Sequence, residues 1–165
     1  MERYTLSMLV KNHSGVLSRV SGLFSRRGYN IESLSVGVTE NENISRITIV
    51  VLGDQYVVEQ ITKQLNKLID VIKIGVLEGD GAVCRGLMLV KVTATEQTRT
   101  AVLQIVDIFR AKVIDICATS LIVEMTGDKS KQQALLDMLE PFGILEISKT
   151  GLAGLQRGEV QLKNC

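Results

Sequence analysis

The apolar residues of this 165-residue chain change their spacing in a fixed order, and that order occurs twice. In the first half, segments of alternating polarity and segments of helical spacing predict strand, helix, strand, strand, helix and strand by residue 78. The same order begins again after a glycine-rich segment at 79–82. The repeat is one of architecture, because the residues themselves are not repeated. We therefore predict two small domains of the same kind.

The first half contains two amphipathic helices. The first is predicted at about 14–27, with Ser14 as its N-cap and Gly28 as its stop. The second follows Asp54, and the polar residues 40–43 predict a hairpin between the second and third strands. The predicted buried stripes are Val16, Leu17, Val20, Leu23 and Phe24 in the first helix, and Val57, Val58, Ile61, Leu65 and Leu68 in the second.

The second half begins with a strand at 87–92 and has a predicted hairpin of strands at 113–117 and 121–125. Pro141 is expected to end the last helix before a final strand at 144–147. The predicted stripes are Val102, Ile105, Val106 and Phe109 in one helix, and Ala134, Leu135, Met138 and Leu139 in the other.

The element order predicts the α+β class, with two ferredoxin-like βαββαβ domains. In each domain an antiparallel sheet is expected to carry both helices on one face. We place the first domain at 1–78, a linker at 79–85 and the second domain, with an irregular tail, at 86–165. Domains of this size bury a limited share of their surface and leave sheet edges open, so we expect the chain to associate.

Composition excludes several classes of function. The net charge is +1, aromatic residues make up 4% and tryptophan is absent, so we expect no binding to nucleic acid. No apolar run reaches the roughly 20 residues of a membrane helix, and we expect no membrane partner. Three widely spaced cysteines, Cys84, Cys117 and Cys165, predict neither a disulfide framework nor a metal site, and favour a cytoplasmic location.

The segment Asn12–Leu17 lies between the first strand and the first helix and predicts a loop that binds a small ligand. The first backbone N–H groups of a helix have no partners within the helix and form a site for an anion. Gly15 lacks a Cβ and lets a ligand approach the backbone closely. The carboxylate of an amino acid suits this position.

Three segments, 12–20, 23–34 and 45–49, resemble the small regulatory subunits of acetolactate synthase, also called acetohydroxyacid synthase. They read NHSGVLSRV, LFSRRGYNIESL and SRITI. The resemblance continues through 60–65, 87–92 and 150–158, and so covers nearly the whole chain.

The resemblance implies an N-terminal ACT domain, which senses an amino acid, followed by a second ACT-like domain. It also implies a homodimer that binds the catalytic large subunit, activates it and confers feedback inhibition by valine in branched-chain amino acid biosynthesis. Thiamine diphosphate, magnesium and FAD would belong to the catalytic partner, so no cofactor, no metal and no catalytic residue is assigned to this chain.

The family's pattern places the effector between the loop of one protomer and a segment of the other. Carried over by motif, backbone N–H groups near Gly15 hold the carboxylate of valine, and the side-chain carbonyls of Asn12 and Asn30 accept from its ammonium group. Hydrocarbon around Val16, Leu17 and Ile31 receives the branched side chain. The predicted effector-binding residues are Asn12, His13, Ser14, Gly15, Val16, Leu17, Asn30 and Ile31.

Two more residues match positions that the family associates with effector response. Gly37 lies in the second strand, where it can instead relieve crowding between backbones, and Gln60 lies in the second helix, where it can instead be a solvated residue. Both alternatives stay open.

Three other functions compete with this interpretation. A free-standing amino-acid sensor that regulates another enzyme or transcription is the first, but no basic helix-turn-helix segment is found. An enzyme is the second, but the single histidine, His13, has no recognisable triad around it. The second half also resembles the metal-sensing half of nickel-responsive repressors, but it lacks histidine, and Cys117 is expected in the core.

Overall fold

The structure is a computed structural model that describes residues 2–162. Of these, residues 2–83 and 151–162 together form one compact unit, and Cys84–Thr150 form the second unit. The tail was predicted as part of the second domain, and the structure instead assigns it to the first unit.

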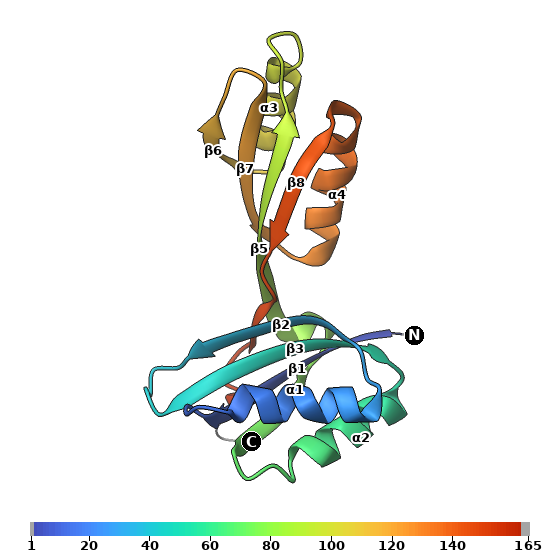
Figure 1. Cartoon of the computed structure of the whole chain (residues 1–165), viewed down its shortest axis with the longest axis vertical. Coiled ribbons are helices and arrows are strands. Elements are labelled where there is room, and N and C mark those ends of the chain that lie inside the picture. Colours follow the sequence, from blue (N-terminus) through green and yellow to red (C-terminus); the bar gives the residue numbers. More distant parts are fainter. Residues whose placement is uncertain (1, 163–165) are drawn as a thin grey trace. The chain divides into compact units, whose positions relative to one another are not determined.

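The first unit contains one four-stranded sheet and two helices, which lie side by side on one face of the sheet (Figure 1). Its strands follow the order β2-β3-β1-β4, and all neighbours are antiparallel. The elements are β1 (Glu2–Lys11), α1 (Val16–Arg27), β2 (Ile31–Val38), β3 (Ile44–Gly53), α2 (Gln55–Leu65) and β4 (Val71–Leu77). This arrangement confirms the predicted ferredoxin-like fold.

The second unit repeats this topology, with the strand order β6-β7-β5-β8. A short helical turn, η1 (Gly79–Gly81), precedes it, and β9 pairs with β5 outside that order. Its elements are β5 (Ala82–Thr93), α3 (Arg99–Ile108), β6 (Lys112–Ile116), β7 (Ser120–Gly127), α4 (Lys129–Leu139), η2 (Glu140–Phe142) and β8 (Ile144–Lys149). Strand β9 (Ala153–Gln156) lies in the tail, which belongs to the first unit.

Each unit has its own hydrophobic core between the helices and one face of its sheet. In β1, Leu6, Met8 and Val10 are at most 1% exposed and belong to the same buried cluster as Val20 and Phe24 of α1. In the second unit, alternate residues of β5 pack in the same way with α3 and α4. Period-two strands and period-3.6 helices bring their apolar residues to the same layer.

The start of α1 differs from the prediction, whereas its end agrees with it. The helix begins at Val16, and its N-cap is Gly15, in the left-handed region at φ +85° and without a side-chain cap. Ser14 is therefore not the N-cap. Gly28 ends the helix at φ +70°, as predicted, and its N–H donates to Ser25 O at 3.2 Å.

The predicted buried faces hold except at α1 and α4. Leu17 is 41% exposed, and both Ala134 and Met138 of α4 face solvent. Gln132 and Leu136 are buried in their place. Burial of Gln132 is possible because its side-chain amide donates a hydrogen bond to Gly86 O at 2.8 Å. The periodicity of apolar residues counts glutamine as polar, so the predicted buried face of α4 was rotated about the helix axis relative to the observed one.

The predicted linker at 79–85 is wrong in its second part, because β5 already begins at Ala82. This start of β5 pairs with β9, and Arg157 N donates to Gly81 O at 2.8 Å. Cys117 was also predicted wrongly: β6 is an edge strand that ends at Ile116, so the cysteine lies in the turn and is exposed. The first residues of β5 were predicted as a linker because their pairing partner, β9, lies about seventy residues further along the chain, where local sequence patterns give no sign of it.

The face of the first sheet that carries no helix is also covered at its centre. Ser7 of β1 and Thr48 of β3 point to this face and are 0% and 3% exposed. A Cβ on Gly75 of β4 would lie 3.0 Å from Leu162, and a Cβ on Gly151 would lie 2.4 Å from the carbonyl oxygen of Leu34. The tail, residues 151–162, therefore packs closely against the sheet, through a backbone contact at Gly151 and through the Leu162 side chain at Gly75.

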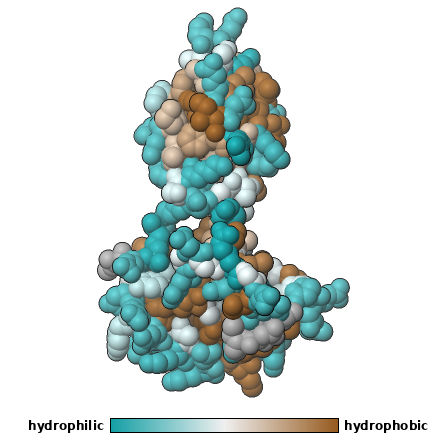
Figure 2. All heavy atoms as spheres, turned by 180° about the vertical axis from the view of Figure 1, so that it is seen from behind, coloured by the Kyte–Doolittle hydropathy of each residue, from teal (hydrophilic) through white to brown (hydrophobic). Residues whose placement is uncertain are grey.

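Hydrophobic side chains remain exposed on both units, as Figure 2 shows for one side of the molecule. On β2, an edge strand of the first sheet, Val36 and Val38 are 45% and 58% exposed. On β6, an edge strand of the second sheet, Ile114 and Ile116 are 56% and 59% exposed. Apolar residues on open edges favour association with another chain.

Within residues 2–162, no helix has both the length and the apolar character that crossing a bilayer requires. The same residues contain no group of three or more histidine, cysteine or acidic side chains placed to hold a metal ion.

We predict that Gly151→Ala destabilises the protein by about 1 to 3 kcal/mol, because the new methyl group collides with backbone atoms that cannot rotate away. The free energy of unfolding in urea measures this effect. Gly22→Ala is the matched control: that glycine lies inside α1 with nothing within 4 Å of an added Cβ, so the same change should be neutral or stabilising by up to about 1 kcal/mol. Equal effects of the two substitutions would contradict tight packing of the tail.

Candidate functional site

The loop between β1 and α1 is held by the hairpin between β2 and β3. The backbone N–H of Asn12 donates to Asn43 O at 2.8 Å, and its side-chain Nδ2 donates to Glu42 O at 2.7 Å. Because Nδ2 is used in this way, the side-chain oxygen of Asn12 remains as an acceptor. The residue is exposed and can therefore present this oxygen to a ligand.

The start of α1 presents unpaired backbone donors. The first hydrogen bond of the helix runs from Arg19 N to Gly15 O at 3.0 Å. The leading N–H groups of a helix, here those of Val16, Leu17 and Ser18, have no partners in the helix itself, and within residues 2–162 no side chain caps this helix. These donors and the positive end of the helix dipole favour an anion at this position.

The side chains of the loop differ in what they can offer to a ligand. Val16 is 3% exposed and packs in the core, so only its backbone can contact a ligand. Leu17 is 41% exposed and Ile31 is partly buried, and both keep accessible hydrocarbon. Val16 starts the buried stripe of α1, so in the single chain the accessible hydrocarbon comes from Leu17 and Ile31 instead of the Val16 side chain.

Asp70, which no sequence pattern indicated, holds the loop in place through contacts with its neighbours. It lies just before β4, its side chain is 8% exposed, and Arg19 reaches it from α1 with Nε at 2.8 Å and Nη2 at 2.6 Å from Oδ2. His13 Nε2 lies 2.9 Å from Oδ1, and Lys11 N donates to Asp70 O at 2.9 Å. Asp70 thus connects four parts of the unit: its carboxylate holds the loop and α1, and its main-chain oxygen ties the start of β4 to the end of β1.

The charged state of Asp70 follows from these contacts. Burial by itself raises the pKa of the carboxyl group, but the hydrogen bonds and charges of Arg19 and His13 act in the opposite direction, and the resulting pKa lies below its usual value. Asp70 is therefore ionised at neutral pH.

Both ring nitrogens of His13 have contacts within the chain. Its Nε2 contacts Asp70, and its Nδ1 lies 3.2 Å from the carbonyl oxygen of Ser14. Both ring nitrogens therefore face acceptors of the protein itself. The contact with Asp70 links the loop to the start of β4.

Asn30 and Ile31 lie at the opposite end of the sheet from this loop within one chain. Ile31 pairs with Val51, which pairs with Tyr4, whereas the loop follows Lys11. Tyr4 and Lys11 are seven residues apart on β1, which corresponds to about 23 Å at the usual rise of a strand. One chain therefore does not bring the two predicted parts of the site together.

Backbone crowding within the single chain does not account for Gly37, and the roles of Gly37 and Gln60 in effector response stay predictions. An added Cβ on Gly37 would meet nothing within 4 Å, so crowding of backbones does not explain this glycine. It pairs with Arg46, next to Leu9, toward the end of the sheet where the loop lies. Gln60 is partly buried on α2.

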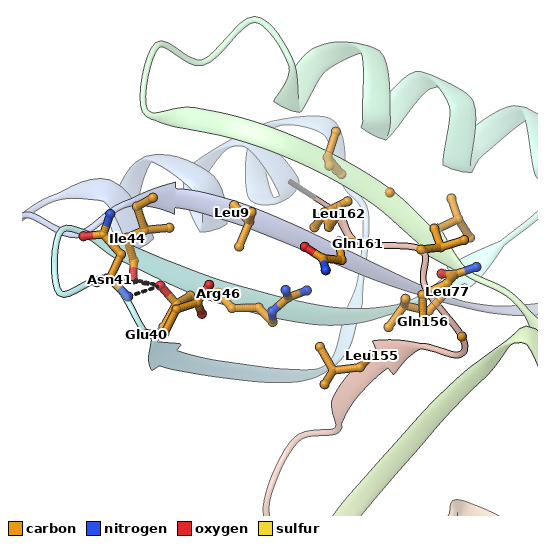
Figure 3. Close-up of a pocket in the computed structure, with 16 residues that line it drawn as sticks. Leu9, Glu40, Asn41, Ile44, Arg46, Leu77, Leu155, Gln156, Gln161 and Leu162 are labelled. Atoms are coloured by element: carbon orange, nitrogen blue, oxygen red, sulfur yellow. Dashed lines mark hydrogen bonds between the residues drawn. The ribbon is translucent and has the colours of Figure 1, made fainter. Parts of the chain in front are cut away.

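A cavity of about 680 Å³ lies elsewhere in the first unit, between its sheet and the tail. Figure 3 shows Leu9 and Arg46 of the sheet facing Leu155 and Leu162 of the tail. Arg46 Nη1 donates to Ser7 Oγ at 2.7 Å. None of the predicted effector-binding residues lines this cavity. In a single chain, the predicted site is therefore a surface loop.

Comparisons with known proteins agree on one family. The family model described as the AHAS small subunit-like ACT domain matches residues 6–73, and the model described as the small subunit of acetolactate synthase matches residues 85–158. The acetolactate synthase small subunits of Mycobacterium leprae and Mycolicibacterium smegmatis are each 54% identical over 155 residues. These alignments cover 94% of this chain and 92% and 91% of the relatives.

Among solved structures, the small subunit of acetolactate synthase from Thermotoga maritima is similar with a TM-score of 0.89 and 38% sequence identity. The superposition covers 97% of this chain and 100% of the other. The similarity therefore extends over both units.

We predict that Asp70→Asn lowers the melting temperature at pH 7. The pKa of Asp70 is lower in the folded state than the usual value of about 3.9, so its stabilising contribution is complete above that value and is lost as the pH falls below it. The difference between the wild type and the variant should therefore narrow between about pH 5 and about pH 3. Calorimetry across this range measures the difference.

Asp80→Asn removes the same charge from an exposed position in η1 and serves as the control. We expect little change in its melting temperature at any pH. A difference between Asp70→Asn and the wild type that does not depend on pH would contradict the ionised role of Asp70.

Proposed function

The chain belongs to the family of acetolactate synthase small subunits, and on that premise we propose that it is a non-catalytic regulatory subunit. In this proposal it binds the thiamine-diphosphate-dependent catalytic subunit in the cytoplasm, raises its activity and makes it sensitive to valine. The observation that carries the proposal is the loop at the start of α1, with unpaired backbone donors at a glycine of positive φ.

The loop offers a separate group for each part of an amino acid. The N–H groups of Val16, Leu17 and Ser18 face the carboxylate, and the side-chain oxygen of Asn12 is available to the ammonium group. Leu17 provides accessible hydrocarbon for the branched side chain. One methylene is worth about 1 to 3 kcal/mol in such a pocket, so leucine and isoleucine should bind more weakly than valine without being excluded.

The register of the sheet supports a site that two chains share. Val38 of β2 aligns through Ser45 with Val10, and so lies at the same end of the sheet as the loop. If two β2 edges pair antiparallel along their whole length, Ile31 of the partner subunit lies opposite Val38. Asn30 of the partner subunit then lies beside the loop, whereas within one chain Asn30 is at the opposite end of the sheet. Such pairing also covers Val36 and Val38.

An effector bound across this interface must also strengthen the dimer, because binding to the assembled state shifts the equilibrium toward it. Its effect on the catalytic subunit is a coupling free energy between two sites, typically about 1 to 3 kcal/mol. We assign no cofactor to this chain, and we assign thiamine diphosphate, magnesium and FAD to the catalytic partner.

Reconstitution tests the regulatory role directly. The purified chain is added to the catalytic subunit of the same organism, and acetolactate formation is measured with and without valine. We expect the chain to be inactive alone, to raise the turnover of the catalytic subunit and to make it sensitive to valine. Valine binding without any effect on that subunit would instead favour a free-standing amino-acid sensor.

We predict that Gly15→Asp abolishes binding of valine, as measured by calorimetric titration of the purified chain. The residue has φ +85°, and its new carboxylate would stand where the carboxylate of valine is held. Gly15→Ala introduces the same backbone strain without the charge, and should weaken binding less. A Gly15→Asp variant that keeps wild-type affinity and dimerises normally would remove this loop from the site.

We predict that Asn30→Ala weakens valine binding by about 1 to 3 kcal/mol, the cost of losing one buried hydrogen-bond partner of a charged group. Asn30 is exposed in the single chain, so stability should change little. Asn66→Ala, at the end of α2, is a matched control that should bind valine normally. Equal affinities of the Asn30 variant and the wild type would exclude Asn30 from the site.

A further inference from the structure

The guanidinium group of Arg19 lies over the glycine of the effector loop. A Cβ built on Gly15 would lie 3.3 Å from Arg19 Nη1. This placement follows from the helix, because residues four apart lie on one face and side chains tilt toward the N-terminus. Arg19 therefore reaches back from α1 to the position at which backbone donors face a ligand.

Only one edge of this guanidinium is occupied. Nε and Nη2 both contact Oδ2 of Asp70, whereas Nη1 has no hydrogen-bond partner in the described part of the chain. The planar guanidinium has five donors in a fixed arrangement, so an arginine can bind one carboxylate along its side and a second one at its end. The end that carries Nη1 is the one nearest to Gly15.

Asp70 holds the guanidinium in this position before any ligand arrives. Its side chain is 8% exposed and is fixed on the other side by His13 Nε2 at 2.9 Å. Its main-chain oxygen accepts from Lys11 N, at the end of β1. A long, half-exposed arginine side chain would otherwise lose rotamer entropy on binding, and this prior ordering reduces that loss.

We propose that Arg19 is a ligand-contacting residue of the effector site, that its Nη1 donates to the carboxylate of the bound amino acid, and that Asp70 is its positioning residue. The proposal rests on the function proposed above. It gives the loop a charged donor in addition to the backbone N–H groups. It also predicts a preference for a free carboxylate, because an ionised acceptor forms a stronger hydrogen bond with the guanidinium than a neutral amide oxygen does.

The test compares valine with valinamide, in which the carboxylate is replaced by a neutral amide. Binding of each to the full-length chain is measured by chemical-shift titration, which follows weak binding, for the wild type, Arg19→Gln and Arg19→Lys. Arg27→Gln, which removes an exposed arginine from the last turn of the same helix, is the matched control.

We expect the wild type and Arg27→Gln to prefer valine over valinamide to the same degree. Arg19→Gln should weaken valine binding about 10- to 100-fold, the usual range for a hydrogen bond to a charged group, and leave valinamide binding nearly unchanged. Arg19→Lys keeps the charge but lacks the planar edge that pairs with Asp70, so its affinity for valine should lie between those of the wild type and Arg19→Gln. Asp70→Asn should also reduce the preference for valine, by less than Arg19→Gln.

Two results would overturn the inference while leaving the proposed function intact. One is a wild type that binds valine and an Arg19→Gln variant that binds it equally well. The other is an Arg19→Gln variant that is folded by circular dichroism but loses both ligands to the same extent, since that pattern indicates a general disturbance of the loop. A wild-type chain that binds no valine, alone or with its catalytic subunit, would overturn the proposed site itself.

Discussion

One-sided burial is the constraint on which the rest of this structure depends. Each sheet has two helices, and both cover the same face, so that Leu6 and Met8 in one unit and Val90 and Val92 in the other are fully buried. The second face of each sheet and the unpaired backbone groups of its edge strands have to be covered by other parts of the chain or by another chain. In the first unit that role falls to the tail, and on β2 we assign it to a second copy of the chain.

The covered second face explains several residues that would otherwise look unsuited to a sheet. Ser7 and Thr48 are buried polar residues at its centre, and Gly75 and Gly151 allow close approach of the tail and of the sheet backbone. Larger side chains at these positions would hold the tail away from the sheet. The first unit therefore consists of the ACT-like fold and a segment that the chain supplies from its other end.

The site depends on a similar long-range connection. Backbone donors at the start of α1 are a general feature of helices and do not by themselves select an amino acid. Selectivity in our proposals comes from what is added to them: Asn12 held by the hairpin, Arg19 held by Asp70, and Asn30 of the partner subunit brought in by the β2 edge. Each of these contributions comes from a different part of the fold.

The sequence by itself determined the order of the elements, the fold class, the end of α1 at Gly28 and the loop at Asn12–Leu17, because these features depend on residues close to one another in the chain. Only the tertiary structure decided that β5 begins at Ala82, that the tail packs on the first sheet and that Gln132 is buried. It also placed Asp70 beneath Arg19, 51 residues away. Periodicity reports which face of an element is apolar, but it contains no information about which distant residue satisfies a buried polar group or a free strand edge.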